Sequence, residues 1–156
     1  MHKLIKLHGE EIAAAHKWMA PGLRGLTKGQ RAFCSWDEDV NTMAVEAARD
    51  CLDKRPVAGI GAVTLASTTV PFADLQNAAI VAGALELPKS VRALDLANSQ
   101  RVGTAGLAAA LQGGGEALFV ASDRPRGKPA STQEISYGAG AAAFTLGSEN
   151  VVATLL

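Results

Sequence analysis

Residues 95–107, with the sequence DLANSQRVGTAGL, form the stretch that decides the expected fold. The short apolar run VRALDLA at residues 91–97 indicates a buried β-strand. Residues 103–112 are rich in alanine and predict a helix that ends at three consecutive glycines. Asn98, Ser99 and Gln100 lie between them as a polar turn. The stretch therefore predicts a strand that passes through a tight turn into a helix of small residues.

The same alternation of strands and helices continues on both sides of this stretch. Before it, we expect a strand at residues 59–67 and helices at 10–18, 73–85 and from 41 or 42 to about 55, the last capped by Asp39 or Asn41. After it, we expect strands at 117–122, 140–146 and 151–155, the last two as a hairpin, while 23–35 and 123–136 are expected to be loops. Because the strands are nearly all apolar, this order predicts an α/β fold: a mostly parallel mixed sheet with helices on its faces and a C-terminal antiparallel strand pair.

Length and composition fit one globular domain spanning residues 1–156, with enough chain to bury a core. Lys+Arg and Asp+Glu both number 15, and this balance argues against an electrostatic nucleic-acid binder. The first nine residues contain no continuous apolar run, so we expect neither a signal peptide nor a membrane span, and a cytoplasmic location. Two cysteines do not make a disulfide framework. Cys51 is expected to be a small buried apolar residue, whereas Cys34 is either an ordinary loop thiol or a reactive one.

The common catalytic and metal-binding templates find little support. His2, His8 and His16 have no carboxylate or cysteine neighbour at metal-ligand spacing, so we expect surface or interface histidines and no metal. The run GAGAAA at residues 138–143 imitates a dinucleotide-binding fingerprint, but it follows a loop and opens a strand rather than a helix.

Three segments, taken together in this order and spacing, resemble the thiolase-like superfamily. They are DEDVNTMAVEAAR at residues 37–49, DLANSQRVGTAGL at 95–107 and YGAGAAA at 137–143. Within the superfamily they are similar to the 3-hydroxy-3-methylglutaryl-CoA synthase family, especially its bacterial and archaeal members, and the resemblance covers residues 10–155. It implies a thiolase-like N-terminal half-fold and acyl-CoA condensation, transfer or cleavage, with a coenzyme A thioester as substrate and no tightly bound cofactor.

The resemblance fails at the two positions that carry the family's chemistry. Gln100 matches the acyl-accepting cysteine, and an amide cannot form a thioester. Ser99 is adjacent, but the neighbour of a nucleophile on a sharp turn points elsewhere. Ser67 matches the serine that precedes the family's general-acid glutamate, and the next residue is Thr68, which cannot do acid–base work at neutral pH. The chain is therefore expected not to be catalytically self-sufficient.

Other site residues follow from the resemblance alone. The residues expected to shape the site are Asn98, Ser99, Gly103, Gly138 and Gly140. The residues expected near the mouth of the coenzyme A site are Trp18, Arg24, Lys28 and Arg31, whose cations suit phosphates, with a solvated basic loop as the alternative. A second basic group follows the strand at 117–122 and contains Arg124, Arg126 and Lys128. Its loop is expected to be a lid, a subunit interface or an ordinary surface loop.

The extent of the resemblance raises the question of partners. Complete members of the family join two similar halves. In this chain the family's first, central strand is expected to be shortened or missing. Three explanations stay open: residues 1–7 form a short strand, a partner chain completes the sheet, or the sequence is a truncated product. We expect a homo- or hetero-oligomer, with a complementary thiolase half and a zinc-ribbon/OB-fold protein as candidate partners. Three functions stay open: a subunit of an acyl-CoA-processing complex, an active hydroxymethylglutaryl-CoA synthase-like acyltransferase, and a non-catalytic scaffold or gene remnant.

Overall fold

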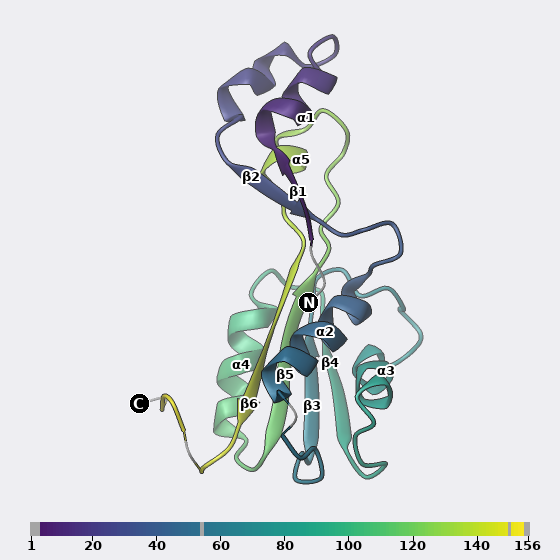
Figure 1. Cartoon of the computed structure of the whole chain (residues 1–156), viewed down its shortest axis with the longest axis vertical. Helices are drawn as coiled ribbons and strands as arrows, with labels where there is room; N and C mark the ends of the chain where they lie inside the picture. Colours follow the sequence, from purple (N-terminus) through teal and green to yellow (C-terminus); the bar gives the residue numbers. More distant parts are fainter. Residues whose placement is uncertain (1–3, 54, 150, 155–156) are drawn as a thin grey trace. The chain divides into compact units, whose positions relative to one another are not determined.

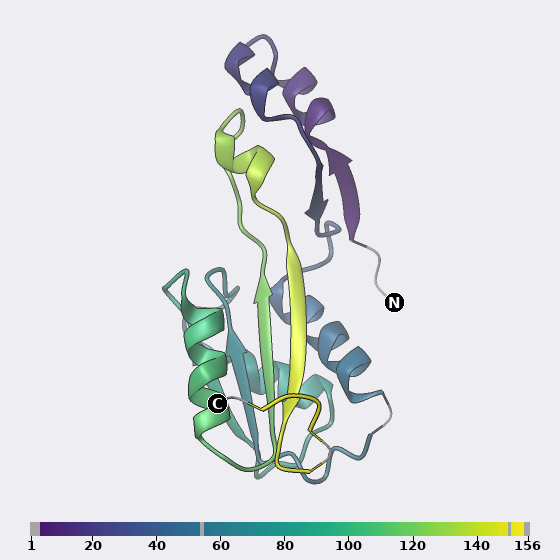
Figure 2. The same cartoon turned by 90° about the vertical axis from the view of Figure 1, so that its left-hand side faces the viewer.

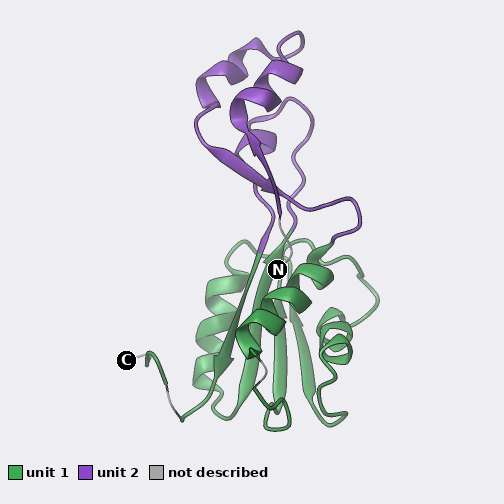
Figure 3. Cartoon of the chain, in the orientation of Figure 1, with its two compact units in different colours: residues 1, 39–123, 141–156 green, residues 2–38, 124–140 purple. Residues whose placement is uncertain are grey.

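The structure is a computed structural model that describes residues 4–53, 55–149 and 151–154. The described chain divides into two compact units (Figure 3). The first unit contains residues 39–123 and 141–154, and the second contains residues 4–38 and 124–140. The chain therefore passes between the units at three points in the sequence.

The first unit is built on a four-stranded sheet in the order β4-β3-β5-β6. Its strands are β3 (Ala62–Ala66), β4 (Arg92–Leu96), β5 (Ala117–Asp123) and β6 (Gly140–Leu146). β3 runs parallel to both β4 and β5, with Val63 opposite Ala93 on one side and Leu118 on the other. β6 lies beside β5 and runs in the opposite direction (Figures 1 and 2). The predicted mixed, mostly parallel sheet is confirmed.

Helices cover both faces of this sheet. They are α2 (Val40–Leu52), α3 (Asn77–Ala84) and α4 (Val102–Gln112). Apolar side chains of α2 and α3 pack with inward-facing residues of β3 and β5 in one core, which includes Ala44, Val81, Val63, Leu118 and Val120. α4 covers the opposite face (Figure 2).

The approach of α4 to the sheet depends on a missing side chain. Gly106 is buried, and a Cβ atom there would lie 2.7 Å from Leu96 Cδ1 and 3.1 Å from Phe119 Cε2. Such distances are well inside ordinary carbon–carbon contact. A side chain at this position would therefore force the Leu96 side chain and the Phe119 ring to shift.

The second unit is smaller and has its own sheet. β1 (Ile5–His8) pairs antiparallel with β2 (Gln30–Phe33), with Leu7 opposite Arg31. Between them come α1 (Gly9–Ala15) and η1 (Pro21–Leu26), a 3-10 helix, and the short α5 (Thr132–Ser136) completes the unit.

Three predictions for chain segments are wrong. Residues 123–136, predicted as a loop, contain α5, whose start is capped by the Ser131 hydroxyl that accepts from the Glu134 amide. In the other two cases strand pairing is the reason. Residues 23–35, predicted as a loop, contain β2, because β1 offers this segment a pairing partner more than 20 positions away. The hairpin of 140–146 with 151–155 does not form in the described residues, since 151–154 contain no strand and residue 155 lies outside them. The antiparallel pair at this end of the sheet is β5 with β6.

The main sheet is also continuous where the resemblance implies a further central strand. β3 and β5 pair directly, Ala62 opposite Ala117 and Ala66 opposite Ala121, so their backbone groups satisfy each other. The facing edges of these two strands are therefore paired with each other. β1, the element nearest the start of the described chain, pairs with β2 instead.

No helix among the described residues has the length and apolar character that a bilayer crossing would require.

Candidate functional site

Two positions predicted to be catalytic lie where the parallel strands of the main sheet end. The registers place Ala66 opposite Leu96 and opposite Ala121, so β3 and β4 end at the same level while β5 continues two residues further, to Asp123. The Ser67 amide continues this alignment by donating to the Leu96 carbonyl oxygen at 2.9 Å. Thr68 follows β3 and Gln100 follows β4, at the carboxyl ends of parallel strands, where open α/β sheets bind their ligands.

The turn that carries Gln100 is held by its own backbone. Asn98 has φ +68°, a left-handed conformation that asparagine tolerates better than most residues. The Ser99 carbonyl oxygen accepts from the Val102 amide at 3.0 Å, and the Ser99 hydroxyl accepts from the Arg101 amide at 3.2 Å. The hydroxyl of Ser99 is therefore used in shaping the turn, while Gln100 is exposed just before α4 begins.

The glycines near this turn differ in what they allow. At Gly103, predicted to shape the site, an added Cβ atom would meet no heavy atom of the described chain within 4 Å. At Gly106 it would clash with Leu96. Packing thus gives a reason for a small residue at position 106 and none at position 103.

Asp123, the last residue of β5, lies at the candidate site and was not predicted from the sequence. Its Oδ1 atom accepts hydrogen bonds from Ser67 Oγ (3.0 Å), Thr68 N (2.7 Å), Thr68 Oγ1 (3.0 Å) and Thr69 Oγ1 (3.1 Å). Ser67 is fully buried. One carboxylate oxygen at the end of β5 therefore fixes the loop that leaves β3, including the position predicted to replace the family's acid. The available signal was a charged residue that ends the apolar run ALFVAS.

A second carboxylate fixes the strand that leads into the turn. Asp95 of β4 accepts from the Asn77 amide at 2.7 Å and the Ala78 amide at 2.6 Å, so it caps the start of α3. The buried Asn77 side chain also donates to Asp95 at 3.0 Å and accepts from Asn41 Nδ2 at 3.2 Å. This cap explains why α3 begins at Asn77 and not at residue 73 as predicted.

The residues predicted near coenzyme A lie in the second unit. Trp18 is 82% exposed, and Arg24 on η1 and Lys28 are also exposed. Arg31 on β2 is only 8% exposed. Its guanidinium lies 4.0 Å from the centroid of the Phe33 ring and donates to the backbone oxygen of Glu134. Burial lowers the pKa of Arg31, and the Glu134 carboxylate acts in the opposite direction.

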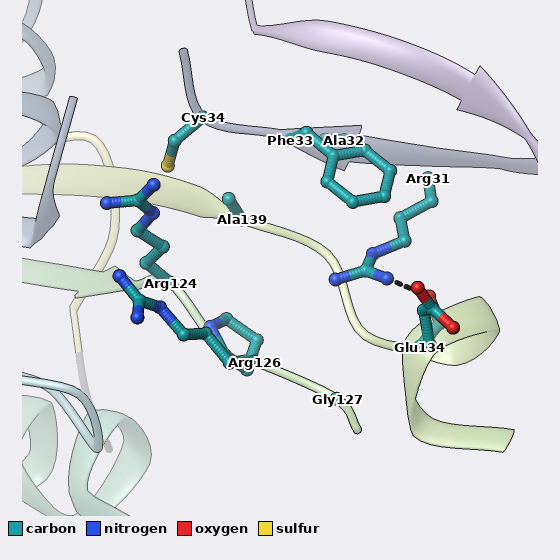
Figure 4. Close-up of a pocket in the computed structure, with 10 residues that line it drawn as sticks. Arg31, Ala32, Phe33, Cys34, Arg124, Arg126, Gly127, Glu134 and Ala139 are labelled. Carbon is teal, nitrogen blue, oxygen red and sulfur yellow. Dashed lines mark hydrogen bonds between the residues drawn. The ribbon is translucent and has the colours of Figure 1, made fainter. Parts of the chain in front are cut away.

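A cavity of about 240 Å³ adjoins Arg31 in this unit (Figure 4). One wall comes from β2 and the residue after it, and the other from the segment that follows β5. The polar lining residues are Arg31, Cys34, Arg124, Arg126 and Glu134. Arg124 and Arg126 thus join a residue predicted for ligand binding, which the sequence alone did not indicate.

The glycines at residues 138 and 140 belong to the same unit. The Ala139 amide donates to the Ala32 carbonyl oxygen at 2.9 Å, and a Cβ atom at Gly138 would lie 3.7 Å from Ala32 backbone atoms. A Cβ atom at Gly140 would meet nothing within 4 Å in the described chain. Gly138 therefore lies against β2.

Among the described residues, no group of three or more His, Cys, Asp or Glu side chains is arranged to hold a metal ion.

Comparisons with known proteins point in one direction. No protein-family model matches the chain. The hydroxymethylglutaryl-CoA synthase of Methanocaldococcus jannaschii is 35% identical over 137 residues, which are 83% of this chain and 40% of that protein. The hydroxymethylglutaryl-CoA synthase of Aeropyrum pernix is 34% identical over 151 residues, 92% of this chain and 42% of that protein. The chain spans about two fifths of the length of these relatives.

Solved structures give the same result for the fold. MvaS in complex with 3-hydroxy-3-methylglutaryl coenzyme A superposes with a TM-score of 0.75 at 26% identity, over 91% of this chain and 36% of that one. A hydroxymethylglutaryl-CoA synthase complexed with CoA gives 0.82 at 21% identity, over 96% and 40%. A 3-oxoacyl-(acyl-carrier-protein) synthase III gives 0.78 at 20% identity, over 94% and 47%.

Proposed function

Because this chain resembles the N-terminal half of thiolase-like condensing enzymes, and hydroxymethylglutaryl-CoA synthases among them, we propose that it is a subunit that takes part in acyl-CoA condensation, transfer or cleavage without being catalytically self-sufficient. The observation that carries the proposal is Gln100. It occupies an exposed turn at the start of α4, the place where the family implies an acyl-accepting cysteine.

The residues at the turn before α4 are better suited to binding a substrate than to covalent catalysis. A thiol at a helix N-terminus gains thiolate character, but an amide gains no nucleophile there. Ser99 does not replace it, because its hydroxyl accepts from the Arg101 amide. Thr68 is tied to Asp123 through both its amide and its hydroxyl. The Gln100 amide can still donate a hydrogen bond to a thioester carbonyl, which would help a partner's chemistry.

The substrate in this proposal is a coenzyme A thioester that is not tightly bound. Three exposed residues of the second unit suit its charged and aromatic parts: the Trp18 ring for stacking, and Arg24 and Lys28 for phosphates. The missing nucleophile would come from another protein, with a complementary thiolase half or a second copy of this chain as candidates. A zinc-ribbon/OB-fold protein, expected from the resemblance, is a further candidate.

The test combines acyl labelling with reconstitution. We expect the chain alone, incubated with radiolabelled acetyl-CoA, to carry no label that survives denaturation. Mixing it with candidate partners is expected to release free coenzyme A, measured with a thiol reagent. The variant Cys34→Ser is the matched control, because a label lost with that substitution would sit on the cavity thiol and not at the turn.

The other two functions make different predictions for the same experiment. A stable acyl label that the chain alone carries and that persists in the Cys34→Ser variant would support a self-sufficient acyltransferase and overturn the proposal. A chain that neither binds coenzyme A in a titration nor changes the activity of any partner would be a scaffold or remnant.

A further inference from the structure

The segment that follows β5, residues 124–140, belongs to the second unit but takes no part in its apolar interior. All of its residues are described, and none of them is buried. Among the described residues, the buried apolar side chains of this unit, which include Ile12 and Leu23, all belong to residues 4–38. Burial of apolar area is the main force that fixes a segment in a fold, so polar contacts must hold this one. We call residues 124–140 the strap.

The strap is braced internally. The Glu134 carboxylate accepts from the Ala130 amide at 2.6 Å, and the Ser131 hydroxyl accepts from the Glu134 amide at 3.2 Å. The same hydroxyl donates to the Lys128 carbonyl oxygen at 2.6 Å. A Cβ atom at Gly127 would overlap the backbone of Glu134, so the loop closes tightly on itself. A loop packed in this way can move as one body.

Two of the contacts that attach the strap to the rest of its unit meet at Glu134. Its backbone oxygen accepts from the Arg31 guanidinium on β2, and its Oε2 atom lies 3.0 Å from His16 Nε2, just after α1. A further contact lies near the end of the strap, where the Ala139 amide donates to the Ala32 carbonyl oxygen at 2.9 Å. Glu134 therefore ties the strap both to β2 and to the end of α1.

The two ends of the strap differ in how firmly they are held. On one side the chain comes from Asp123, which accepts from the Ser67 hydroxyl at 3.0 Å and the Thr68 amide at 2.7 Å. On the other side lies Gly140, where an added Cβ atom would meet nothing within 4 Å in the described chain. Packing does not require a glycine there, and glycine has the widest choice of backbone angles. Gly140 is therefore placed to absorb a hinge movement of the strap.

We propose that the strap opens away from β2 and closes on it, with Glu134 as its latch. The structure shows the closed state, in which the strap and β2 line the cavity of about 240 Å³ and Cys34 lies in its wall (Figure 4). Opening breaks the hydrogen bond from Ala139 to Ala32 and exposes the cavity to solvent. Strap opening is independent of the proposed function, because all of these contacts lie within the second unit.

The variant that tests the latch is His16→Ala, because it removes a strap contact from outside the strap. Glu134 keeps its contacts with the Ala130 amide and with Arg31 in this variant. An ionised carboxylate only accepts hydrogen bonds, so the His16 ring donates through Nε2 and the variant loses one hydrogen bond. Lys17→Ala, at the exposed neighbouring position, is the matched control.

The first measurement is amide hydrogen exchange of the whole chain, followed by NMR. The Ala139 amide should exchange faster than the amides of Val63 and Leu65, buried residues of β3, which are exposed only by global unfolding. Exchange at Ala139 should also depend little on low concentrations of urea, because strap opening exposes little surface. His16→Ala should speed exchange at Ala139 about fivefold, since one hydrogen bond fewer holds the strap closed. Lys17→Ala should match the wild type.

Labelling of Cys34 tests the same movement from the side of the cavity. A maleimide that carries a polyethylene glycol chain is too large for a cavity of about 240 Å³, so it should reach Cys34 through the open state. His16→Ala should therefore raise the labelling rate by the same factor as exchange at Ala139. Cys51 on α2 belongs to the other unit and is the internal reference for the reagent.

The outcomes decide whether the strap moves on its own. If Ala139 exchanges as slowly as β3, or with the same dependence on urea, the strap opens only when the whole chain unfolds and the proposal is wrong. An unchanged rate in His16→Ala would contradict the role of Glu134 as latch. Different factors at Ala139 and Cys34 would indicate local fraying instead of one moving strap. Equal factors in His16→Ala, with neither rate changed in Lys17→Ala, would support the proposal.

Discussion

The turn before α4 and the cavity beside β2 hold polar groups in opposite ways. At the turn, the backbone is constrained by a left-handed Asn98 and by hydrogen bonds to Ser99, while Gln100 is neutral and exposed. In the cavity, the charged group is itself buried, since Arg31 is 8% exposed. The first region is therefore fixed by its backbone, and the second by the contacts of a charged side chain with the Phe33 ring and the Glu134 backbone oxygen.

The largest expected loss of stability comes from disturbing the packing of α4 beside the turn. Gly106→Val should destabilise the protein by about 2–3 kcal/mol, because the branched side chain has to displace the Leu96 side chain and the Phe119 ring. Gly103→Val is the control and should cost much less, since a Cβ atom there meets nothing in the described chain. Denaturant unfolding measures both. Equal losses at the two positions would mean that close packing does not hold the turn region.

The next effect would loosen the same region through its polar contacts. Asp123→Ala should destabilise the protein by about 2 kcal/mol, because Ser67 loses a partner in a buried position and the loop after β3 is released. Asp74→Ala removes an exposed carboxylate of the same unit and should change little. Chemical denaturation gives the free energies, and hydrogen exchange of the Thr68 amide shows whether the loop opens. An unchanged exchange rate would contradict the role given to Asp123.

The smallest expected effect tests the second unit through the contacts of Glu134. Glu134→Gln should destabilise the protein by about 1 kcal/mol, because the side chain loses its charged contact with His16 and accepts more weakly from the Ala130 amide. Chemical denaturation measures the change. An unchanged free energy of unfolding would show that these contacts do not hold the second unit.

The main strands and helices could be predicted because their patterns are local. Strands β3, β4 and β5 follow apolar runs. Helix α2 begins at Val40 and is capped by Asp39, one of the two predicted caps, whose side chain accepts from the Thr42 amide at 2.8 Å. The β2 strand could not be predicted this way. Its sequence QRAF carries no strand signal of its own, and it becomes a strand because β1 pairs with it.

The candidate site residues also differ in whether local sequence was enough to predict their positions. Thr68 and Gln100 could be expected at one sheet edge, since parallel strands end together. Asp123 could not be joined to Thr68, because the two are 55 positions apart and meet only through the register of β3 with β5. Whether the turn and the loop residues act on coenzyme A stays a prediction.

By itself, the sequence determined the α/β order and the overall balance of charge, and it led to the prediction that Gln100 occupies the position of the family's nucleophile. Those properties depend on residue identity and on neighbours a few positions away. Tertiary structure alone decided that β3 pairs directly with β5, that Gly106 and not Gly103 is the close contact, and that Arg31, Arg124 and Arg126 surround one cavity. These depend on contacts between segments far apart in the chain, where burial turns an ordinary arginine into one that needs an acceptor.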